Sequence, residues 1–134
     1  MNRFAGSTPR ERESLVVDAI DAHRERDSPY LTLEVDRTAA NREETAGPPP
    51  WIQYRDRDGQ LNMDCTDGEL ESIEAAIDSL GGVRVTDRSS DPEAGTNLRV
   101  TASGDDERIA MIVETLFVDG FGLAEDQVVW AAEI

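Results

Sequence analysis

The second half of the chain contains one pattern twice, and this pattern limits the available folds more than any other feature. In the first unit, alternating apolar residues over 60–65 lead to Thr66, a predicted helix N-cap with Glu69 as its capping-box partner. An apolar stripe follows at helical spacing, and a glycine pair beginning at Gly81 ends it. The next alternating segment, 83–87, is a predicted strand.

The second unit has the same order of elements. A strand over 98–102 precedes Ser103 as the predicted N-cap, a second apolar stripe ends at glycines, and 127–134 forms the last strand. The polar segment 88–97 is predicted as the loop between the units. Residues 60–134 therefore have the order β-α-β-β-α-β, which is the split βαβ arrangement of ferredoxin-like folds.

A predicted hairpin comes before this core. The segments WIQYRDR (51–57) and QLNMDC (60–65) flank an Asp-Gly pair, which favours a two-residue turn with positive φ. Such a turn places Tyr54 opposite Met63 and gives the hairpin one apolar face and one polar face.

The hairpin conflicts with the ferredoxin-like order of strands. In that order the last strand, 127–134, lies beside strand 60–65, where the hairpin also places 51–57. Three alternatives remain open: strand 127–134 moves away, 51–57 pairs only briefly, or the sheet has another order.

The N-terminal region adds further elements. Thr8 as N-cap predicts a helix over 8–26, and alternation over 30–36 predicts a strand. Segment 37–50 has no period and ends in three prolines, so it is predicted as a loop. We expect one α+β domain over 1–134, a two-layer sandwich with a ferredoxin-like core, an added N-terminal helix and strand, and a hairpin strand.

The charge pattern indicates the environment of the protein. The chain has 29 acidic residues and 13 Lys or Arg residues, all of them arginine, for a net charge of −16. Arginine is more weakly hydrated than lysine and pairs bidentately with carboxylates, so this surface is typical of a halophilic archaeal protein. At molar salt the Debye length is about 3 Å, which screens the self-repulsion. An acidic protein of another source, or one with a basic partner, is the alternative.

Composition also limits location and partners. No apolar run approaches the about 20 residues of a membrane span, and the N-terminus has no apolar signal core, so we expect a cytoplasmic protein without a membrane partner. The net charge opposes nucleic acid in dilute buffer, because phosphate binding depends on basic side chains, but a salt-rich cytoplasm weakens this objection. No phosphate-loop, hydrolase or zinc motif occurs, and we expect no cofactor.

The single cysteine and the single histidine are the first candidates for catalysis. Cys65 comes just before a helix start, which activates thiols, but the acidic residues around it disfavour a thiolate. The alternation over 61–65 points Cys65 into the core, where we expect it to pack as a small hydrophobic residue. His23 ends the apolar stripe of the first helix and is also expected to pack. No catalytic residue is predicted.

Carboxylates recur near a glycine in DRDGQLNMD (56–64), as they do in calcium loops. The segment lacks the ligand spacing and the terminal glutamate of an EF-hand. The turn already explains its Asp-Gly pair, so no metal site is predicted.

The outward face of the predicted sheet carries the candidate ligand-binding residues Asn62, Asp64, Arg84 and Arg99. Arg84 and Arg99 lie on neighbouring strands and are placed to bind a small anion. Two alternatives stand beside this interpretation: both arginines form ion pairs with nearby acidic residues, or helix 8–26 covers them. An RNA-binding sheet of this topology would show aromatic residues at these positions, which hold none.

Two tryptophans stand out in a chain with few aromatic residues. Trp51 lies off the apolar face of its hairpin, so we predict that it either anchors a protein partner or caps the far side of the sheet beneath helix 8–26. Trp130 shares a face with Val128 and Ala132 and is predicted to lie in the core.

Several segments together resemble a known family. From residue 11 onward, PYLTLEVD, PPPWIQYRDRDGQLNMDCTDGEL, ERIAMIVETLF, FGLAED and VVWAAEI are similar to a family of small acidic haloarchaeal proteins with no assigned function. The resemblance implies an α+β domain in a halophilic cytoplasm and brings no catalytic residues.

These observations favour a non-enzymatic protein-binding or regulatory module. It would engage a protein partner, or a second copy of itself, through the sheet face or the N-terminal segment. The alternative is a small-anion or metabolite binder, or an enzyme, that uses Arg84 and Arg99.

Overall fold

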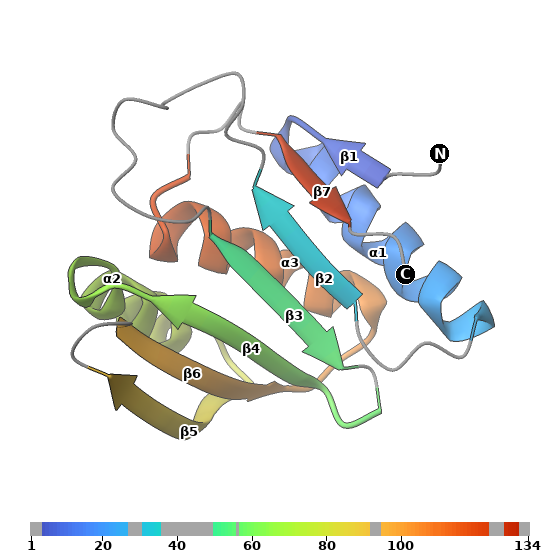
Figure 1. Cartoon of the computed structure of the whole chain (residues 1–134). Coiled ribbons are helices and arrows are strands. Elements are labelled where there is room, and N and C mark those ends of the chain that lie inside the picture. The colour runs from blue at the N-terminus through green and yellow to red at the C-terminus, as the bar shows by residue number, and fades with distance from the viewer. Residues whose placement is uncertain are drawn as a thin grey trace.

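The computed structural model describes residues 4–26, 31–35, 50–55, 57–91, 95–123 and 128–131. These residues form an α+β structure (Figure 1). Its elements are β1 (Phe4–Gly6), α1 (Pro9–Glu25), β2 (Leu31–Val35), β3 (Trp51–Arg55), β4 (Gln60–Cys65), α2 (Asp67–Ser79), β5 (Val83–Asp91), β6 (Gly95–Ala102), α3 (Asp106–Thr115), a π-helical turn η1 (Leu116–Gly120) and β7 (Val129–Ala131). The predicted loop 37–50 lies outside the described residues except for Pro50.

The described strands form one sheet in which each strand is antiparallel to its neighbours, in the order β1-β7-β2-β3-β4-β6-β5. Strands β4, β6 and β5 lie in the order that a ferredoxin-like sheet requires, while β2 and β3 stand between β4 and β7. Of the three alternatives for the hairpin, the last strand has moved away. The hairpin holds the place beside β4 because a short loop joins its strands, whereas β7 is distant in sequence.

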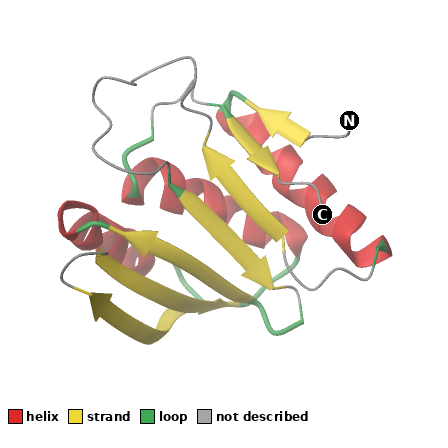
Figure 2. Cartoon of the chain, in the orientation of Figure 1, coloured by secondary structure: helices red, strands yellow, loops and turns green. Residues whose placement is uncertain are grey.

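The helices lie on one face of the sheet (Figure 2). Alternate residues of β2, β3, β4 and β6 point to this face and are buried together with the apolar stripes of the helices. Helix α1 packs against α3 on this same side. It therefore does not cover the opposite face, and the interpretations that place Arg84, Arg99 or Trp51 beneath helix 8–26 are wrong.

Side-chain caps fix the helix starts. Thr8 and Thr66 accept hydrogen bonds from the backbone N–H groups of Glu11 and Glu69, as their spacing predicts. In α2 the Glu69 carboxylate also accepts from the Thr66 N–H, which completes the capping box. The N-cap of α3 is Asp105, and not the predicted Ser103: the Asp105 carboxylate accepts a hydrogen bond from the backbone N–H of Arg108.

The hairpin differs from its predicted register. Gln60 pairs with Arg55, so Tyr54 lies opposite Leu61 and not opposite Met63. A shift of two residues keeps every side chain on its predicted face. The longer loop places Gly59 at φ 67°.

The polar segment predicted as a loop at 88–97 instead lengthens two strands. Strand β5 continues to Asp91 and β6 begins at Gly95. Backbone hydrogen bonds to β6 extend β5 through a polar segment in which the side-chain pattern alone predicts no strand. A bulge between Val85 and Asp87 interrupts this ladder.

A buried ion pair joins α1 to α3. The Arg12 guanidinium donates to both carboxylate oxygens of Glu114, at 2.9 Å from Nε and 2.8 Å from Nη2. Arg12 is 2% exposed. Among the described residues, no helix is long and apolar enough to cross a membrane.

Candidate functional site

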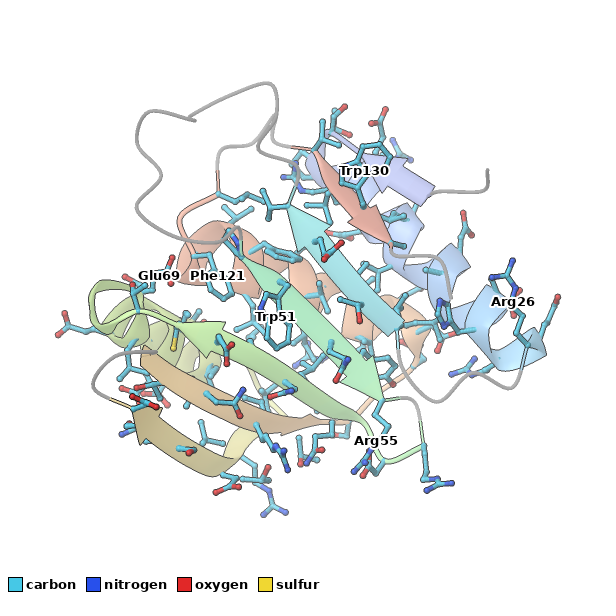
Figure 3. The ribbon with its side chains drawn as sticks, in the orientation of Figure 1. Arg26, Trp51, Arg55, Glu69, Phe121 and Trp130 are labelled. Carbon is cyan, nitrogen blue, oxygen red and sulfur yellow. The ribbon has the colours of Figure 1, made fainter. Side chains whose placement is uncertain are left out.

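The sheet face turned away from the helices, here called the open face, is the candidate site. It carries the strand residues that alternate with the buried ones, and Figure 3 shows labelled Trp51 and Trp130 standing on it. Its residues on the strands from β7 to β6 are Trp130, Thr32, Glu34, Trp51, Gln53, Arg55, Gln60, Asn62, Asp64, Asn97, Arg99 and Thr101.

One row of the open face holds both tryptophans. Glu34 of β2 lies directly opposite Trp51 on one side and directly opposite Trp130 on the other. The two tryptophans are half-buried, and Glu34 is exposed. Trp51 therefore does lie off the apolar face, as predicted.

Contrary to the prediction, Trp130 does not lie in the core. Val129 and Ala131 are the buried residues of β7, and Trp130 alternates with them. Both faces of this segment are apolar in sequence, so the period of two does not identify the buried one. Pairing with β1 and β2 sets the register and turns Trp130 outward.

A neighbouring part of the open face is hollowed. The hollow has a volume of about 110 Å³ and is lined by Gln53, Arg55, Gln60, Asn62 and Arg99. Gln53, Asn62 and Arg99 lie directly opposite one another across β3, β4 and β6.

Amide hydrogen bonds decide which groups face this hollow. Asn97 Nδ2 donates to Asn62 Oδ1 and to Asp64 Oδ1, at 2.8 Å each. Gln60 Oε1 accepts from Arg55 Nη2 at 3.2 Å. Since the side-chain oxygens of Asn62 and Gln60 are engaged, their NH₂ groups remain as donors. Together with the Arg99 guanidinium they give the hollow several hydrogen-bond donors, while Gln53, whose Nε2 donates to Thr32 Oγ1 at 3.4 Å, keeps its side-chain oxygen as an acceptor.

The four predicted ligand-binding residues are only partly brought together. Asn62 and Arg99 both line the hollow, and Asp64 joins Asn62 through Asn97. Arg84 lies one strand further out, opposite Thr101, and does not line it. Within the described part of the chain, neither Arg84 nor Arg99 forms an ion pair, so the expected pairing with nearby acids is absent there.

Arg55, which lines the hollow, forms an ion pair with Asp58 of the hairpin loop. Arg55 Nε donates to Asp58 Oδ1 at 3.0 Å, and its Nη2 pairs with Oδ2. The hydrogen bonds from Arg55 lower the pKa of Asp58 below its ordinary value of 3.8. Asp58 thus lies in the hairpin loop, as predicted, but this loop is longer than the predicted two-residue turn, because β3 ends at Arg55 and β4 begins at Gln60.

Cys65 and His23 lie in the core, 3% and 6% exposed. The thiol of Cys65 donates to the Thr96 carbonyl at 3.5 Å, so the prediction that it packs inward is confirmed. Among the described residues, no three His, Cys, Asp or Glu side chains are grouped to hold a metal ion.

The alternation places Gln53 and Arg55 on the polar face of the hairpin, but sequence reasoning did not name Gln53, Arg55 or Gln60 as site residues, and it missed Trp130 as a residue of the open face. The first three alternate with buried positions in the hairpin, and this signal was available. Their convergence depends on β6 pairing with β4, which no local pattern announces.

A protein-family model described as a family of unknown function (DUF7975) matches residues 1–134. No curated protein and no solved structure matches the chain.

Proposed function

The chain belongs to this family of unknown function, and we propose that it is a non-enzymatic protein-binding module in the cytoplasm of a halophilic archaeon. It engages a partner protein, or a second copy of itself, through the open face of the sheet. We regard its core as a ferredoxin-like unit into which β2 and β3 are inserted.

One observation carries this proposal: two half-buried tryptophans share a row on a sheet face that no described helix covers. Tryptophan is enriched in binding hot spots because it buries a large apolar area and keeps a polar N–H group. Trp51 and Trp130 are flanked by amide and charged side chains, as an interface core is flanked by a polar rim.

The halophilic setting is supported by composition. Every basic residue is arginine and the net charge is −16, so the surface suits a solution in which molar salt screens repulsion. A partner in the same cytoplasm must bind with little help from long-range electrostatics. Apolar contact area, which the tryptophans supply, remains effective there.

The test compares Trp51→Ala and Trp130→Ala with wild type in molar KCl. We expect each variant to lose the captured partner, or the dimer seen by light scattering, while it remains folded. Val85→Thr is the matched control, because Val85 is 39% exposed on β5 away from the tryptophan row. The proposal would be refuted if wild type and the three variants were all monomeric and all captured the same proteins.

A second function is favoured by the hydrogen-bond donors of the hollow. Arg99, Asn62 and Gln60 offer N–H groups to a small anion or a carboxylate-bearing metabolite. Arg99→Gln removes the charge, and Arg84→Gln is the control because Arg84 lies outside the hollow. Inorganic phosphate and organic acids should raise the thermal midpoint of wild type and of Arg84→Gln, and raise it less for Arg99→Gln. No shift with any of them would exclude this function.

A further inference from the structure

The tryptophan row, Trp51–Glu34–Trp130, is a compact constellation. Direct cross-strand neighbours have Cβ atoms about 4.5–5.5 Å apart, so Glu34 lies next to both tryptophans in the row. All three side chains point to the open face, and Glu34 is the exposed member. The row is continuous with the candidate protein-binding surface.

Glu34 differs from the other carboxylates that the structure holds in place. Asp64 accepts a hydrogen bond from Asn97, and Asp58 accepts from Arg55. Within the described chain, by contrast, no hydrogen bond or ion pair engages the Glu34 carboxylate. Its negative charge lies beside two aromatic rings whose faces are also electronegative.

A carboxylate next to two electron-rich rings is complementary to a cation. A cation over an indole face is attracted by the ring quadrupole, and tryptophan is the best aromatic partner for this contact. The net charge of −16 also disfavours an acidic partner. The tryptophan row thus differs from the donor-lined hollow, which is complementary to an anion.

Guanidinium fits the tryptophan row better than ammonium does. Its planar group stacks on aromatic faces and binds a carboxylate through two parallel N–H groups. Guanidinium is also more weakly hydrated than ammonium, so it loses less on leaving water. In molar KCl, where simple charge attraction is screened, stacking and bidentate geometry supply the selectivity.

We propose that the tryptophan row binds the guanidinium group of an arginine side chain presented by the partner protein. This inference rests on the proposed function and names the chemistry of the partner: an exposed arginine that inserts between Trp51 and Trp130 and pairs with Glu34.

The test uses Nα-acetyl-arginine amide as the probe, titrated in molar KCl while the two indole N–H resonances are followed by NMR. We expect both resonances to shift together during the titration. We expect Nα-acetyl-lysine amide to bind with an affinity at least about threefold lower than that of the arginine probe. Glu34→Gln should weaken binding of the arginine probe about tenfold. Glu71→Gln, an exposed change of the same charge on α2, is the control and should leave the affinity unchanged.

The aromatic contribution is tested with paired variants. Trp130→Ala should abolish the shift that the arginine probe causes in the Trp51 indole N–H resonance. Trp130→Phe should retain part of that shift, because an aromatic ring face remains at position 130. The second variant keeps the test valid if the alanine variant does not fold.

Equal affinity for the arginine and lysine probes, or an affinity that Glu34→Gln leaves unchanged, would overturn the inference. The proposed function would survive that result if Trp51→Ala and Trp130→Ala still lost the partner. Loss of partner binding in Glu34→Gln but not in Glu71→Gln would support the inference directly.

Discussion

At the scale of single residues, the least foreseeable feature is the pair of Arg12 and Glu114. An amphipathic stripe defined by apolar side chains assigns Arg12 to solvent, yet it is among the most buried side chains of the molecule. Its fork of N–H groups matches the Glu114 carboxylate, which satisfies both charges where α1 meets α3. Such a pair positions two helices, and its members are costly to separate.

We expect Glu114→Gln to lower the free energy of unfolding by about 3 kcal/mol, because it removes the charge of the carboxylate that pairs with a buried guanidinium. Chemical unfolding in molar KCl measures this. Glu107→Gln, exposed on the same helix, should stay within about 1 kcal/mol of wild type. The double variant Arg12→Met with Glu114→Leu should recover most of the loss. A Glu114→Gln protein as stable as the control would show that the pair is not maintained in solution.

The Arg55–Asp58 contact predicts a small pH effect. Because the pKa of folded Asp58 is lowered, its contribution to stability is present above the ordinary value of 3.8 and is lost as the pH falls through the folded pKa. The carboxyl is 42% exposed, so we expect less than about 1 kcal/mol. Unfolding of wild type and Asp58→Asn, compared from neutral pH downward, should give stabilities that converge below 3.8. A constant difference between the two proteins across this range would contradict the assignment.

At the scale of elements, Gly59 in the hairpin loop allows β3, β4 and the end of β6 to pack closely together. Gly59 has φ 67°, and its carbonyl accepts a hydrogen bond from the Ala102 N–H at 2.8 Å. A Cβ at Gly59 would lie 2.4 Å from the Ala102 carbonyl oxygen. The loop therefore joins β3 and β4 to the end of β6 by close backbone contact.

Gly59→Ala should lower the free energy of unfolding by about 2 kcal/mol or more, from left-handed backbone strain and from the clash with β6. Gly68→Ala is the matched control. Its Cβ would meet only the Thr66 hydroxyl, at 4.0 Å, inside a helix that favours alanine. Urea unfolding of both variants decides, and equal stability would mean that the loop does not approach β6 this closely.

Strand β5 is one edge of the described sheet, and β1 is the other. The sequence of β5 discourages strand addition at its edge. Residues from Arg84 to Asp91 are exposed, the bulge after Val85 bends the strand, and Arg88 pairs with Glu74 of α2. Charge and irregularity of this kind discourage strand addition. The β5 edge is therefore a poorer surface for a partner than the open face that we propose.

At the scale of the whole molecule, the surface charge predicts a dependence on salt. A net charge of −16 repels itself strongly in dilute buffer, where the Debye length is about 10 Å at 0.1 M salt, and much less at about 3 Å in molar salt. We expect the thermal midpoint to rise continuously with KCl up to molar concentration. Sucrose, which stabilises without screening charge, should not replace KCl in this role. Full cooperative stability in salt-free water would contradict the halophilic interpretation.

The sequence by itself determined the features that depend on neighbours along the chain. The capping residues Thr8 and Thr66, the apolar stripes and the alternation in β4 act within a few residues, so they predict the α+β class and the burial of Cys65. The polar side of the hairpin, with Trp51, Asn62 and Asp64, follows from the same alternation.

Only the tertiary structure decided which strands meet. The order β7-β2-β3-β4-β6 depends on pairing between distant segments, and it alone turns Trp130 outward, sets Glu34 next to two tryptophans and places Arg99 beside Gln53 and Asn62. An alternation with apolar residues on both faces cannot specify this, because either face satisfies burial until a neighbouring strand fixes the register.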